Sequence, residues 1–458
     1  MADPPPREVT AIAGNGRVTV SWEAPYGRPD MIAFYDIQPW IGDSPQPTVR
    51  VSATATAGTV TGLANGSSHR FYVRAISTLG TKSAWSEPSN AVTPAAATAV
   101  AQVDAGYAFS CAIVDAGSIE CWGANDHGQL GRGVAVGPPD TPAPVAGITD
   151  AVALSSGQWH SCAVLADATA RCWGSNGAGQ LGNGTTSPSP TPATVVGLTN
   201  VAAISTGEAN TCALLATGSV KCWGDGFHGQ LGNGANADSA TPVTVTGITD
   251  AVAIDVGTTH SCAVRASGTV VCWGENGTRQ LGNGTVTDSS IPVPVMTVTG
   301  AVSVAASNFH SCAVASDGSA WCWGLNTYGR LGNGTTTGVL NPVSVVGLSN
   351  ALAIALGEDH SCALRSTGAI ACWGYNGAPD EDHDPVELGQ LGNGTTVTSS
   401  TPVGVSGISN ATGVDAGSHH SCAVLAASSV QCWGWGSYGQ LGDGGQGSST
   451  LPIPVAGL

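Results

Sequence analysis

The residues with the most evident chemistry in this chain are paired cysteines that recur together with a histidine and a tryptophan. In the stretch from His260 to Thr285, HSCAVRASGTVVCWGENGTRQLGNGT, a histidine stands two residues before the first cysteine and a tryptophan follows the second. Close copies of this stretch occur seven times and contain all 14 cysteines. Such residues serve three kinds of chemistry: a structural disulfide, a metal-binding or redox-active pair of thiols, and reduced thiols buried in a core.

The spacing within each cysteine pair favours the disulfide. If Cys262 faces Cys272, the loop between them is Ala266-Ser267-Gly268, and glycine supplies the left-handed conformation that the third position of such a hairpin loop needs. Residues directly opposite one another on paired strands lie within reach of a cross-strand disulfide. Nine residues between cysteines do not match a zinc ribbon. The predicted bonds are Cys111–Cys121, Cys162–Cys172, Cys212–Cys222, Cys262–Cys272, Cys312–Cys322, Cys362–Cys372 and Cys422–Cys432.

The recurring histidines and tryptophans are interpreted as framework. Histidines spread over successive repeats are not gathered at one metal, so we expect each to hydrogen-bond to a turn. A tryptophan next to a cysteine on a strand points to the opposite face of the sheet, and we expect it to pack against the disulfide of the next repeat. These residues are His160, His260, His310, His360 and His420, with Trp122, Trp173, Trp223, Trp273, Trp323, Trp373 and Trp433.

The elements that position these residues are short strands, repeated with a period near 50. Successive copies start 51, 50, 50, 50, 50 and 60 residues apart. The fifth copy predicts strands over 301–306, 310–314, 319–324 and 342–345, with a turn at 316–318. Four antiparallel strands in each of seven repeats predict a seven-bladed β-propeller over residues 96–458, with one disulfide in each blade.

The same repeats resemble the regulator of chromosome condensation repeat family over about 360 residues. The resemblance rests on the His-Ser pair, the Trp-Gly pair and a Gly-Gln-Leu-Gly motif, which stands at 128–131, 179–182, 229–232, 389–392 and 439–442. Arg279 replaces the first glycine of this motif in the fourth repeat, and Arg330 replaces its glutamine in the fifth. The resemblance implies a propeller fold. Function is only loosely implied, because the family includes nucleotide exchange factors, light sensors and the β-lactamase inhibitory protein II, which has a similar repeat number.

Residues 8–95 predict a separate β-sandwich, after an N-terminal tail over residues 1–7. Alternating segments at 18–22, 32–37 and 71–75 read as short strands between turns. The segment from Gly62 to Ala75, with Trp22 before it and Trp85 after it, resembles a fibronectin type III domain. That family places a tyrosine three residues after a turn glycine. Here Gly66 is followed at that spacing by His69, so an imidazole replaces the tyrosine of the corner or the corner is lost.

Composition and charge exclude several classes of function. The net charge is −17, and residues 98–458 carry all of it, with seven Lys/Arg against 24 Asp/Glu. Because no basic stripe is left to neutralise phosphates, we expect no binding to nucleic acid. No apolar run approaches the length that spans a bilayer, so we expect no membrane insertion. Seven matched cysteine pairs favour an oxidising compartment, which predicts an extracellular or cell-surface protein.

The positions where the repeats disagree are the candidate partner-binding residues. Disagreement concentrates in the loop after the first strand and the loop after the third strand of each repeat, which leave a blade on the same face. Exposed aromatic side chains there favour recognition of another protein. The candidates are Tyr107, Phe109, Trp159, Phe227, Phe309, Tyr328, Tyr375, His419, Trp435 and Tyr438.

A ten-residue insertion in the sixth repeat is the one candidate metal site. Asp380, Asp382 and Asp384 alternate as in the first half of a calcium-binding loop. Pro385 stands where such a loop needs glycine, and Leu391 stands where it needs glutamate. The alternatives are therefore a calcium ion held within residues 378–388 and a solvated acidic loop without any cofactor.

The pattern as a whole predicts a binding protein rather than an enzyme. No catalytic triad or phosphate-binding loop is evident in the repeats. The expected partner is another protein or a surface polymer, and the chain could also self-assemble. Carbohydrate binding is an alternative, since aromatic rings also stack on sugars, and guanine nucleotide exchange is another by family resemblance. Asp104, Asp255 and Asp415 mark the place in the channel where a lyase or hydrolase site would stand.

Overall fold

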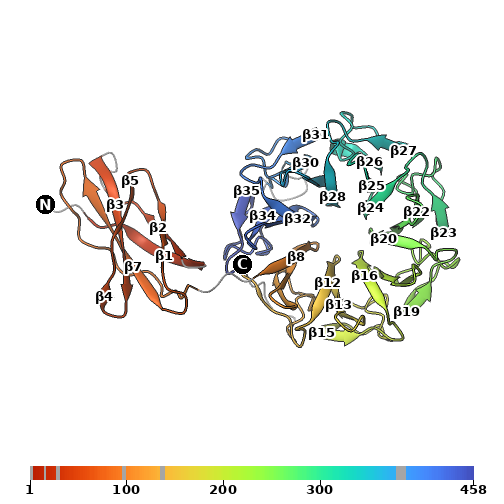
Figure 1. The fold of residues 1–458 in the computed structure, drawn as a ribbon, viewed down its shortest axis with the longest axis horizontal. Coiled ribbons are helices and arrows are strands. Elements are labelled where there is room, and N and C mark those ends of the chain that lie inside the picture. The colour runs from red at the N-terminus through yellow and green to blue at the C-terminus, as the bar shows by residue number, and fades with distance from the viewer. Residues whose placement is uncertain (1–3, 15–16, 27–30, 95–98, 135–139, 378–387) are drawn as a thin grey trace. The chain divides into compact units, whose positions relative to one another are not determined.

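The computed structural model is built almost entirely of β-strands, in two compact units (Figure 1). One unit comprises Met1–Thr98 with Ala456–Leu458, and the other comprises Ala99–Val455. The structure describes residues 4–14, 17–26, 31–94, 99–134, 140–377 and 388–458. Within these ranges no helix has the length and the apolar character required to cross a bilayer.

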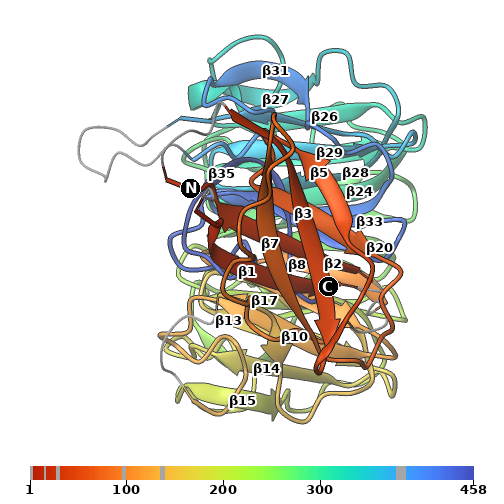
Figure 2. The same cartoon turned by 90° about the vertical axis from the view of Figure 1, so that its left-hand side faces the viewer.

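The N-terminal unit is a two-sheet sandwich, whose strands face the viewer in Figure 2. One sheet has the order β1-β2-β6, and in the other β3 pairs with β4, β5 and β7. The strands are β1 (Arg7–Gly14), β2 (Arg17–Glu23), β3 (Ile32–Ile41), β4 (Ser44–Pro45), β5 (Val49–Ser52), β6 (Ala57–Thr61) and β7 (His69–Ser77). Trp22 and Tyr35 pack between the sheets with ring centroids 5.1 Å apart. The alternation of apolar and polar residues along these strands therefore places the apolar side chains on the face of each sheet that is buried in the sandwich.

The corner of the sandwich is held by backbone rather than by an aromatic hydroxyl. His69 is buried and its backbone N–H donates to Val92 O at 2.7 Å, while Val92 N–H donates back to His69 O at 2.9 Å. Neither ring nitrogen of His69 has a hydrogen-bond partner among the described residues. Of the two alternatives, the structure shows the second: the imidazole of His69 does not replace the tyrosine hydroxyl, and the side-chain corner is lost.

The second unit is a ring of seven four-stranded antiparallel sheets (Figure 1). The innermost strands, which line the channel, are β8 (Val100–Ala105), β12 (Ala151–Ser156), β16 (Val201–Thr206), β20 (Ala251–Val256), β24 (Ala301–Ala306), β28 (Ala351–Leu356) and β32 (Ala411–Ala416). The second strands are β9 (Phe109–Val114), β13 (His160–Leu165), β17 (Asn210–Leu215), β21 (His260–Arg265), β25 (His310–Ala315), β29 (His360–Arg365) and β33 (His420–Leu425).

The remaining two strands complete each blade outward. The third strands are β10 (Ser118–Gly123), β14 (Ala170–Gly174), β18 (Val220–Gly224), β22 (Val270–Gly274), β26 (Ala320–Gly324), β30 (Ile370–Gly374) and β34 (Val430–Gly434). The outermost strands are β11 (Ala143–Pro144), β15 (Ser189–Thr194), β19 (Ser239–Thr244), β23 (Ser289–Pro294), β27 (Val339–Ser344), β31 (Ser399–Gly404) and β35 (Ser449–Pro454). One short 3₁₀ turn, η2 (Thr327–Gly329), follows β26. The predicted all-β sandwich and seven-bladed propeller are confirmed.

The seven predicted disulfides are present, one in each blade. Each joins residues that face one another on the second and third strands, as Cys262 faces Cys272, with Cα atoms 4.1 Å apart in that pair. The loop between them follows the expected geometry, because Gly268 N–H donates to Arg265 O and Gly268 has a φ of +76°. Ala168 and Ser428 take this left-handed position in the second and seventh blades, at φ +60° and +58°.

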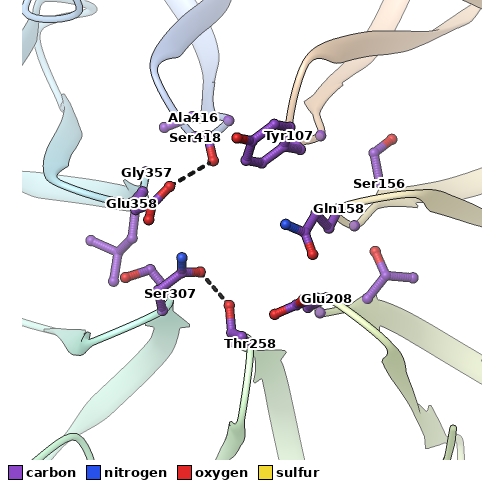
Figure 3. A pocket seen from close by; sticks show the side chains of 18 of the residues that line it. Tyr107, Ser156, Gln158, Glu208, Thr258, Ser307, Gly357, Glu358, Ala416 and Ser418 are labelled. Atoms are coloured by element: carbon purple, nitrogen blue, oxygen red, sulfur yellow. Dashed lines mark hydrogen bonds between the residues drawn. The ribbon is translucent and has the colours of Figure 1, made fainter. Parts of the chain in front are cut away.

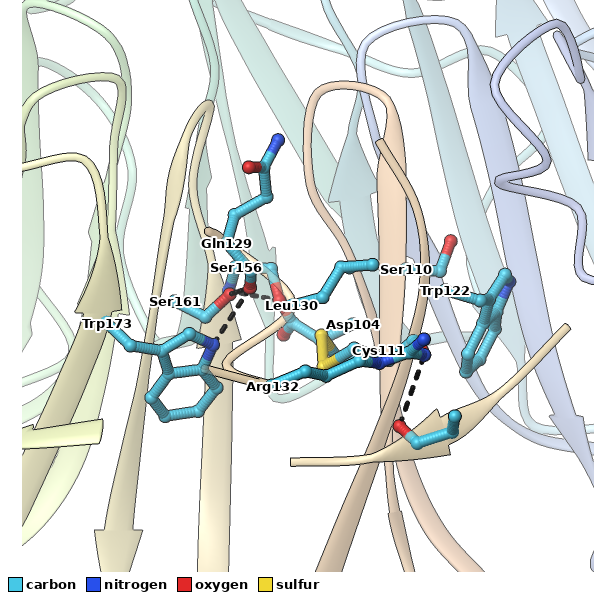
Figure 4. The surroundings of a disulfide bond; sticks show 12 residues. Asp104, Ser110, Cys111, Trp122, Gln129, Leu130, Arg132, Ser156, Ser161 and Trp173 are labelled. Carbon is cyan, nitrogen blue, oxygen red and sulfur yellow. Dashed lines mark hydrogen bonds between the residues drawn. A yellow bond between two sulfur atoms is a disulfide. The ribbon is translucent and has the colours of Figure 1, made fainter. Parts of the chain in front are cut away.

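Successive blades are joined by the tryptophan that follows each second cysteine. Trp173 of the second blade donates from Nε1 to Gln129 O of the first blade at 2.8 Å, and Ser161 Oγ donates to the same carbonyl (Figure 4). All seven tryptophans are fully buried and make this bond to the blade before them, donating to Gln440 O, Gln129 O, Gln180 O, Gln230 O, Gln280 O, Arg330 O and Gln390 O.

The predicted packing of each tryptophan against a disulfide of a neighbouring blade exists, but the prediction named the wrong neighbour. Trp173 shares a buried cluster with Cys111 and Cys121 of the preceding blade, whereas the sequence analysis assigned it to the following one. Five further clusters have the same arrangement. The pleat of a strand separates the two faces of a sheet, but it does not reveal which neighbour each face meets.

The recurring histidines also connect blades. His260 Nε2 lies 2.7 Å from Ser311 Oγ of the next blade, and Ser311 Oγ donates in turn to Gln280 O. His160, His310, His360 and His420 make the same contact to Thr211, Ser361, Ser421 and Ser110. The expected structural role is therefore right, but the bond goes to a neighbouring hydroxyl rather than to a turn. Burial lowers the pKa of His260 to about 3, so its imidazole is neutral.

The ring closes through these same contacts without exchanging a strand. All four strands of the first blade and all four of the last come from single repeats. Across the closure, Trp122 Nε1 donates to Gln440 O at 2.8 Å, and His420 Nε2 lies 2.9 Å from Ser110 Oγ. The contact surface between the last and first blades thus has the tryptophan bond found between all other blades and the histidine contact found between four other pairs of blades.

Candidate functional site

Over the residues that the structure describes, both variable loops of each blade emerge at one end of the propeller, which we call the mouth face. It consists of the loops that join first to second strands and the loops that follow third strands. Rings from the two loop sets touch: Tyr107 lies 6.3 Å from Trp435, and His127 lies 4.9 Å from Trp159. The expectation that these loops share a face is confirmed by these contacts.

The centre of the mouth face is a narrow polar ring around the channel (Figure 3). Each blade contributes one residue, in the order Tyr107, Gln158, Glu208, Thr258, Asn308, Glu358 and Ser418, around a cavity of about 110 Å³. Glycine precedes six of these residues because the backbones of neighbouring blades meet there. A Cβ atom on Gly157 would lie 2.1 Å from Gly207 O. The close approach holds the seven side chains at the rim of one small opening.

Below this ring, the channel contains a belt of carboxylates and hydroxyls. Asp104 accepts a hydrogen bond from Ser156 N at 2.5 Å, Asp255 from Ala306 N at 2.7 Å, and Asp415 from Ala105 N at 2.7 Å. In each pair the acceptor belongs to one blade and the donor to the next. These bonds link neighbouring innermost strands, which are edge strands of their sheets, and side chains such as Gln102 and Ser155 add further hydrogen bonds between innermost strands.

Burial raises the pKa of all three channel carboxyl groups. The pKa of Asp255 rises to about 6 and that of Asp415 to about 7, both through loss of hydration. The pKa of Asp104 also rises well above its usual value, first through burial and then through the nearby charge of Asp415. Sequence reasoning had placed these three residues in the channel. Their hydrogen bonds to the backbone of the adjacent blade give all three a structural role in joining neighbouring blades.

Six rings form a continuous cluster on the mouth face, which we call the aromatic arc. It comprises His419, Trp435 and Tyr438 of the seventh blade, Tyr107 and His127 of the first, and Trp159 of the second. Centroid distances along it are 5.1 Å from Tyr438 to Trp435, 6.3 Å from Trp435 to Tyr107, and 4.9 Å from Tyr107 to Trp159. His419 joins the arc 6.0 Å from Trp435. Five of the ten predicted partner-binding residues therefore gather in one place.

The other predicted residues are more scattered. Phe227 of the third blade is 71% exposed, and its ring lies 5.1 Å from that of the neighbouring His228. Tyr328 of the fifth blade and Tyr375 of the sixth pack against each other, with ring centroids 4.6 Å apart and ring planes tilted by 44°. Phe309 lies near this pair, with the guanidinium of Arg330 5.9 Å from its ring. These residues lie on the mouth face outside the arc.

Phe109 is the one predicted partner-binding residue that the structure removes from the set. Its side chain is completely buried at the start of β9. The residue stands where most repeats have the inter-blade histidine, so it belongs to the framework rather than to a variable loop. Its ring packs in the cluster that contains Trp173, and it cannot contact a partner directly.

The charges at the mouth are negative. Glu358 accepts a hydrogen bond from Ser418 Oγ at 3.2 Å, and its carboxylate lies 3.8 Å from His419 Nε2 (Figure 3). Burial raises the pKa of Glu208, and the charges of Asp225 and Glu358 raise it further. No lysine or arginine occurs among the described residues that line the cavity. An aromatic wall and two carboxylates thus meet at one opening.

The predicted calcium ligands Asp380, Asp382 and Asp384 lie outside the described residues. In the part of the chain that the structure describes, no three histidine, cysteine or acidic side chains are grouped so that they could hold a metal ion.

Sequence reasoning missed most of the polar ring at the mouth. Gln158, Thr258, Asn308 and Ser418 are small or uncharged, and nothing about their types marks them as special. Their signal is positional, since each stands two residues before the framework histidine or its substitute. A comparison of the repeats at that position would have shown seven residues of nearly all different types.

Family models match both units of the chain. The regulator of chromosome condensation (RCC1) repeat matches residues 117–164, 172–214, 217–264, 267–314, 317–364 and 387–424, and the fibronectin type III domain matches residues 4–92. A second model of the repeat finds seven copies between residues 100 and 440. The chain therefore belongs to the family of RCC1-repeat proteins.

Curated relatives match only a small part of their own length. The human E3 ubiquitin-protein ligase HERC2 is 33% identical over 90 residues, which is 19% of this chain and 2% of that protein. The human probable E3 ubiquitin-protein ligase HERC6 is 35% identical over 88 residues, or 9% of its length. The mitochondrial RUG3 of Arabidopsis thaliana is 35% identical over 86 residues, or 19% of its length. These matches lie within the repeats and carry over no ligase activity.

Solved propellers share the fold. Human WBSCR16 superposes with a TM-score of 0.64 at 21% identity, covering 74% of this chain and 94% of that one. Prp20p of Saccharomyces cerevisiae gives 0.61 at 23% identity, covering 74% and 86%. At this level of identity the likeness establishes architecture and nothing more.

Proposed function

We propose that this chain is a binding protein whose mouth face recognises another protein. The aromatic arc carries the proposal, because it gathers six rings from three blades on loops that a rigid framework positions. Tryptophan and tyrosine supply large contact areas with few torsions to fix, and such residues dominate the energy of protein interfaces. Nothing in the framework requires these rings, since the seams between blades already use a different set of tryptophans.

Relatives support a protein partner without naming it. The structure of Prp20p is described together with its binding to Gsp1p and histones, and a second yeast RCC1 structure contains Kap60. Propellers of this fold thus serve as protein-binding surfaces in other organisms. In this chain the partner is proposed from the mouth face alone.

The proposed place of action is outside the cell or at its surface. Seven disulfides in one propeller need an oxidising compartment to form and persist. The same feature, with the acidic charge of the propeller, makes guanine nucleotide exchange for an intracellular GTPase the weaker proposal. We further propose that the chain acts without an enzymatic step and without a required cofactor.

Carbohydrate binding is the second candidate, because exposed rings such as Trp435 and Tyr438 also stack on sugars. The two candidates separate in one experiment on the full chain: a pull-down from secreted proteins of the source organism beside a glycan array. The double variant Trp435→Ala/Tyr438→Ala should lose capture of a protein while keeping its unfolding temperature. Tyr26→Ala, an equally aromatic and 71% exposed site in the N-terminal unit, is the matched control. Glycan binding that the double variant abolishes would replace the protein proposal.

A further inference from the structure

We propose that the partner presents a basic surface and that one of its lysine or arginine side chains enters the mouth of the channel, beside Tyr107 and between Glu208 and Glu358. This inference rests on the proposed function, since it specifies the chemistry of the same surface. It commits to a cationic protein partner, and the observations that carry it are the shape, the side chains and the charge of the mouth.

The first observation is that the aromatic arc reaches the opening itself. Tyr107 belongs both to the arc and to the polar ring, and Figure 3 shows its ring next to Ser418, which in turn is hydrogen-bonded to Glu358. Two tryptophans flank Tyr107, with centroids at 4.9 Å for Trp159 and 6.3 Å for Trp435. Aromatic faces attract ammonium and guanidinium groups through the ring quadrupole. The rings therefore form one wall of a site that favours a cation.

The second observation is the pair of carboxylates across the opening. Figure 3 shows Glu358 and Glu208 on opposite sides of the cavity, both directed toward it. No lysine or arginine lines the described cavity itself. Arg330, outside this lining, donates to the backbone oxygen of Glu358 at 3.2 Å and interacts electrostatically with that residue, whereas the neighbouring charges that act on Glu208 are negative. Burial and the surrounding negative charges raise the pKa of Glu208, which means that its ionised form lacks compensation. A cation seated between the two groups would supply that compensation through charge-assisted hydrogen bonds.

The third observation is the size of the opening. A volume of about 110 Å³ is room for a few water molecules. It matches the end of one long side chain and is too small for a folded element. Lysine and arginine have long apolar stems that lie along aromatic surfaces while the charged head reaches a polar site. The arc would contact the stem, and the two glutamates would contact the head.

The fourth observation is the charge of the propeller as a whole. Residues 98–458 carry 24 acidic against seven basic side chains. Arg330, a basic residue near the mouth, is buried and already paired with Asp359 at 2.6 Å. Asp126, Asp225 and Glu275 add negative charge to the same loops. Such a field attracts a basic partner and repels an acidic one, so the long-range and local electrostatics agree.

The test is a selection of random twelve-residue peptides on the full chain, followed by affinity measurements on mouth variants. The inference predicts that enriched peptides contain lysine or arginine next to apolar residues. Their dissociation constants should rise at least about tenfold for Glu208→Gln/Glu358→Gln, which is the loss of one charge-assisted bond or more. The matched control Asp167→Asn/Asp317→Asn makes the same change of charge at hairpin turns on the opposite end and should alter affinity less than twofold.

The outcomes separate this inference from the proposed function. Peptides that depend on Trp435 and Tyr438 but lack basic residues, or that bind the Glu208→Gln/Glu358→Gln variant unchanged, would overturn the cationic partner and leave protein recognition intact. Selected peptides that respond to neither variant would overturn both. Equal unfolding temperatures of all variants exclude loss of folding as the cause of any change.

Discussion

Trp433 and Trp435 are two residues apart in the seventh blade and have opposite roles. Trp433 is fully buried and donates to Gln390 O at 2.9 Å, the bond that recurs at every seam between blades. Trp435 is only partly covered and lies among His419, Tyr438 and Tyr107 on the mouth face. Tryptophan therefore joins blades at one position of the repeat and is a candidate contact for a partner at another. Position within the repeat, rather than chemistry alone, separates the two regions.

The seams and the mouth also differ in how they tolerate variation. At the seams the contact persists when residues change, since Trp373 donates to Arg330 O just as other tryptophans donate to glutamine carbonyls. At the mouth the seven equivalent positions carry six different residue types. Backbone carbonyls accept hydrogen bonds whatever side chain they bear, so a seam built on them is insensitive to sequence. The described side chains of the mouth face make no such repeated contact, so their residue types are free to vary and to suit a partner.

The largest expected effect separates the two tryptophans directly. Trp433→Ala should cost about 3–5 kcal/mol of unfolding free energy, because it opens a cavity and removes the shorter of the two hydrogen bonds to the Gln390 carbonyl, leaving the one from Ser421 Oγ. Trp435→Ala should cost less than about 1 kcal/mol. Denaturant titration of both variants measures the difference, and equal losses would contradict the division into seam and mouth.

Removal of one disulfide should have the next largest effect. Cys262→Ser/Cys272→Ser should lower the unfolding free energy by about 2–3 kcal/mol, because the short loop it closes is then unrestrained in the unfolded chain. Affinity at the mouth should remain as in the parent chain, since the bond lies in the interior of a blade. Calorimetry and peptide binding on one preparation check both parts.

The contacts between blades that contain a buried histidine should make the unfolding free energy depend on pH. Burial lowers the pKa of His260 to about 3, while an unfolded chain keeps its histidines near 6.5. Between these values the unfolded state binds the proton, so the contribution of a neutral His260 is complete above pH 6.5 and is lost as the pH falls toward 3. The stability advantage of the parent chain over His260→Asn should therefore shrink by about 2 kcal/mol between pH 7 and pH 5. Urea titrations at both pH values give the comparison, and a constant difference would count against a buried neutral imidazole.

The smallest expected effect comes from completing an incomplete seam. Asn210 occupies the histidine position of the third blade, and its buried amide atoms have no hydrogen-bond partner among the described residues. Asn210→His would place an imidazole within reach of Ser261, as His260 reaches Ser311. We expect a gain of about 1 kcal/mol in unfolding free energy. A loss of stability would show that the third seam is built around asparagine.

The features that sequence predicted are those fixed within one repeat. Strand positions, the left-handed turn at Gly268 and the pairing of Cys262 with Cys272 all follow from fewer than 15 consecutive residues. The direction in which tryptophans meet disulfides depends on which neighbour each face of a blade contacts, and no local pattern contains that. Phe109 was misassigned because its aromatic type resembled a loop contact, while its place in the repeat made it a substitute for histidine.

The candidate site could not be predicted from the sequence for a different reason. The arc joins Trp435 to Tyr107, which are neighbours only because the last blade closes on the first. The loops that carry Tyr107 and Trp435 are more than 300 residues apart in the chain, so the residue types could be predicted from sequence but their contact could not. The polar ring has the same origin, with one residue from each of seven repeats.

Hydrogen–deuterium exchange of the full chain, with and without a selected peptide bound, tests the central claim most directly. The account predicts slower exchange in the mouth loops around residues 106–108, 124–130, 157–159, 417–419 and 435–440. It predicts no change in the hairpin turns around 166–168 and 316–318 at the opposite end of the blades. Protection confined to those turns, or to the N-terminal unit, would place recognition elsewhere and contradict the assignment of the mouth face.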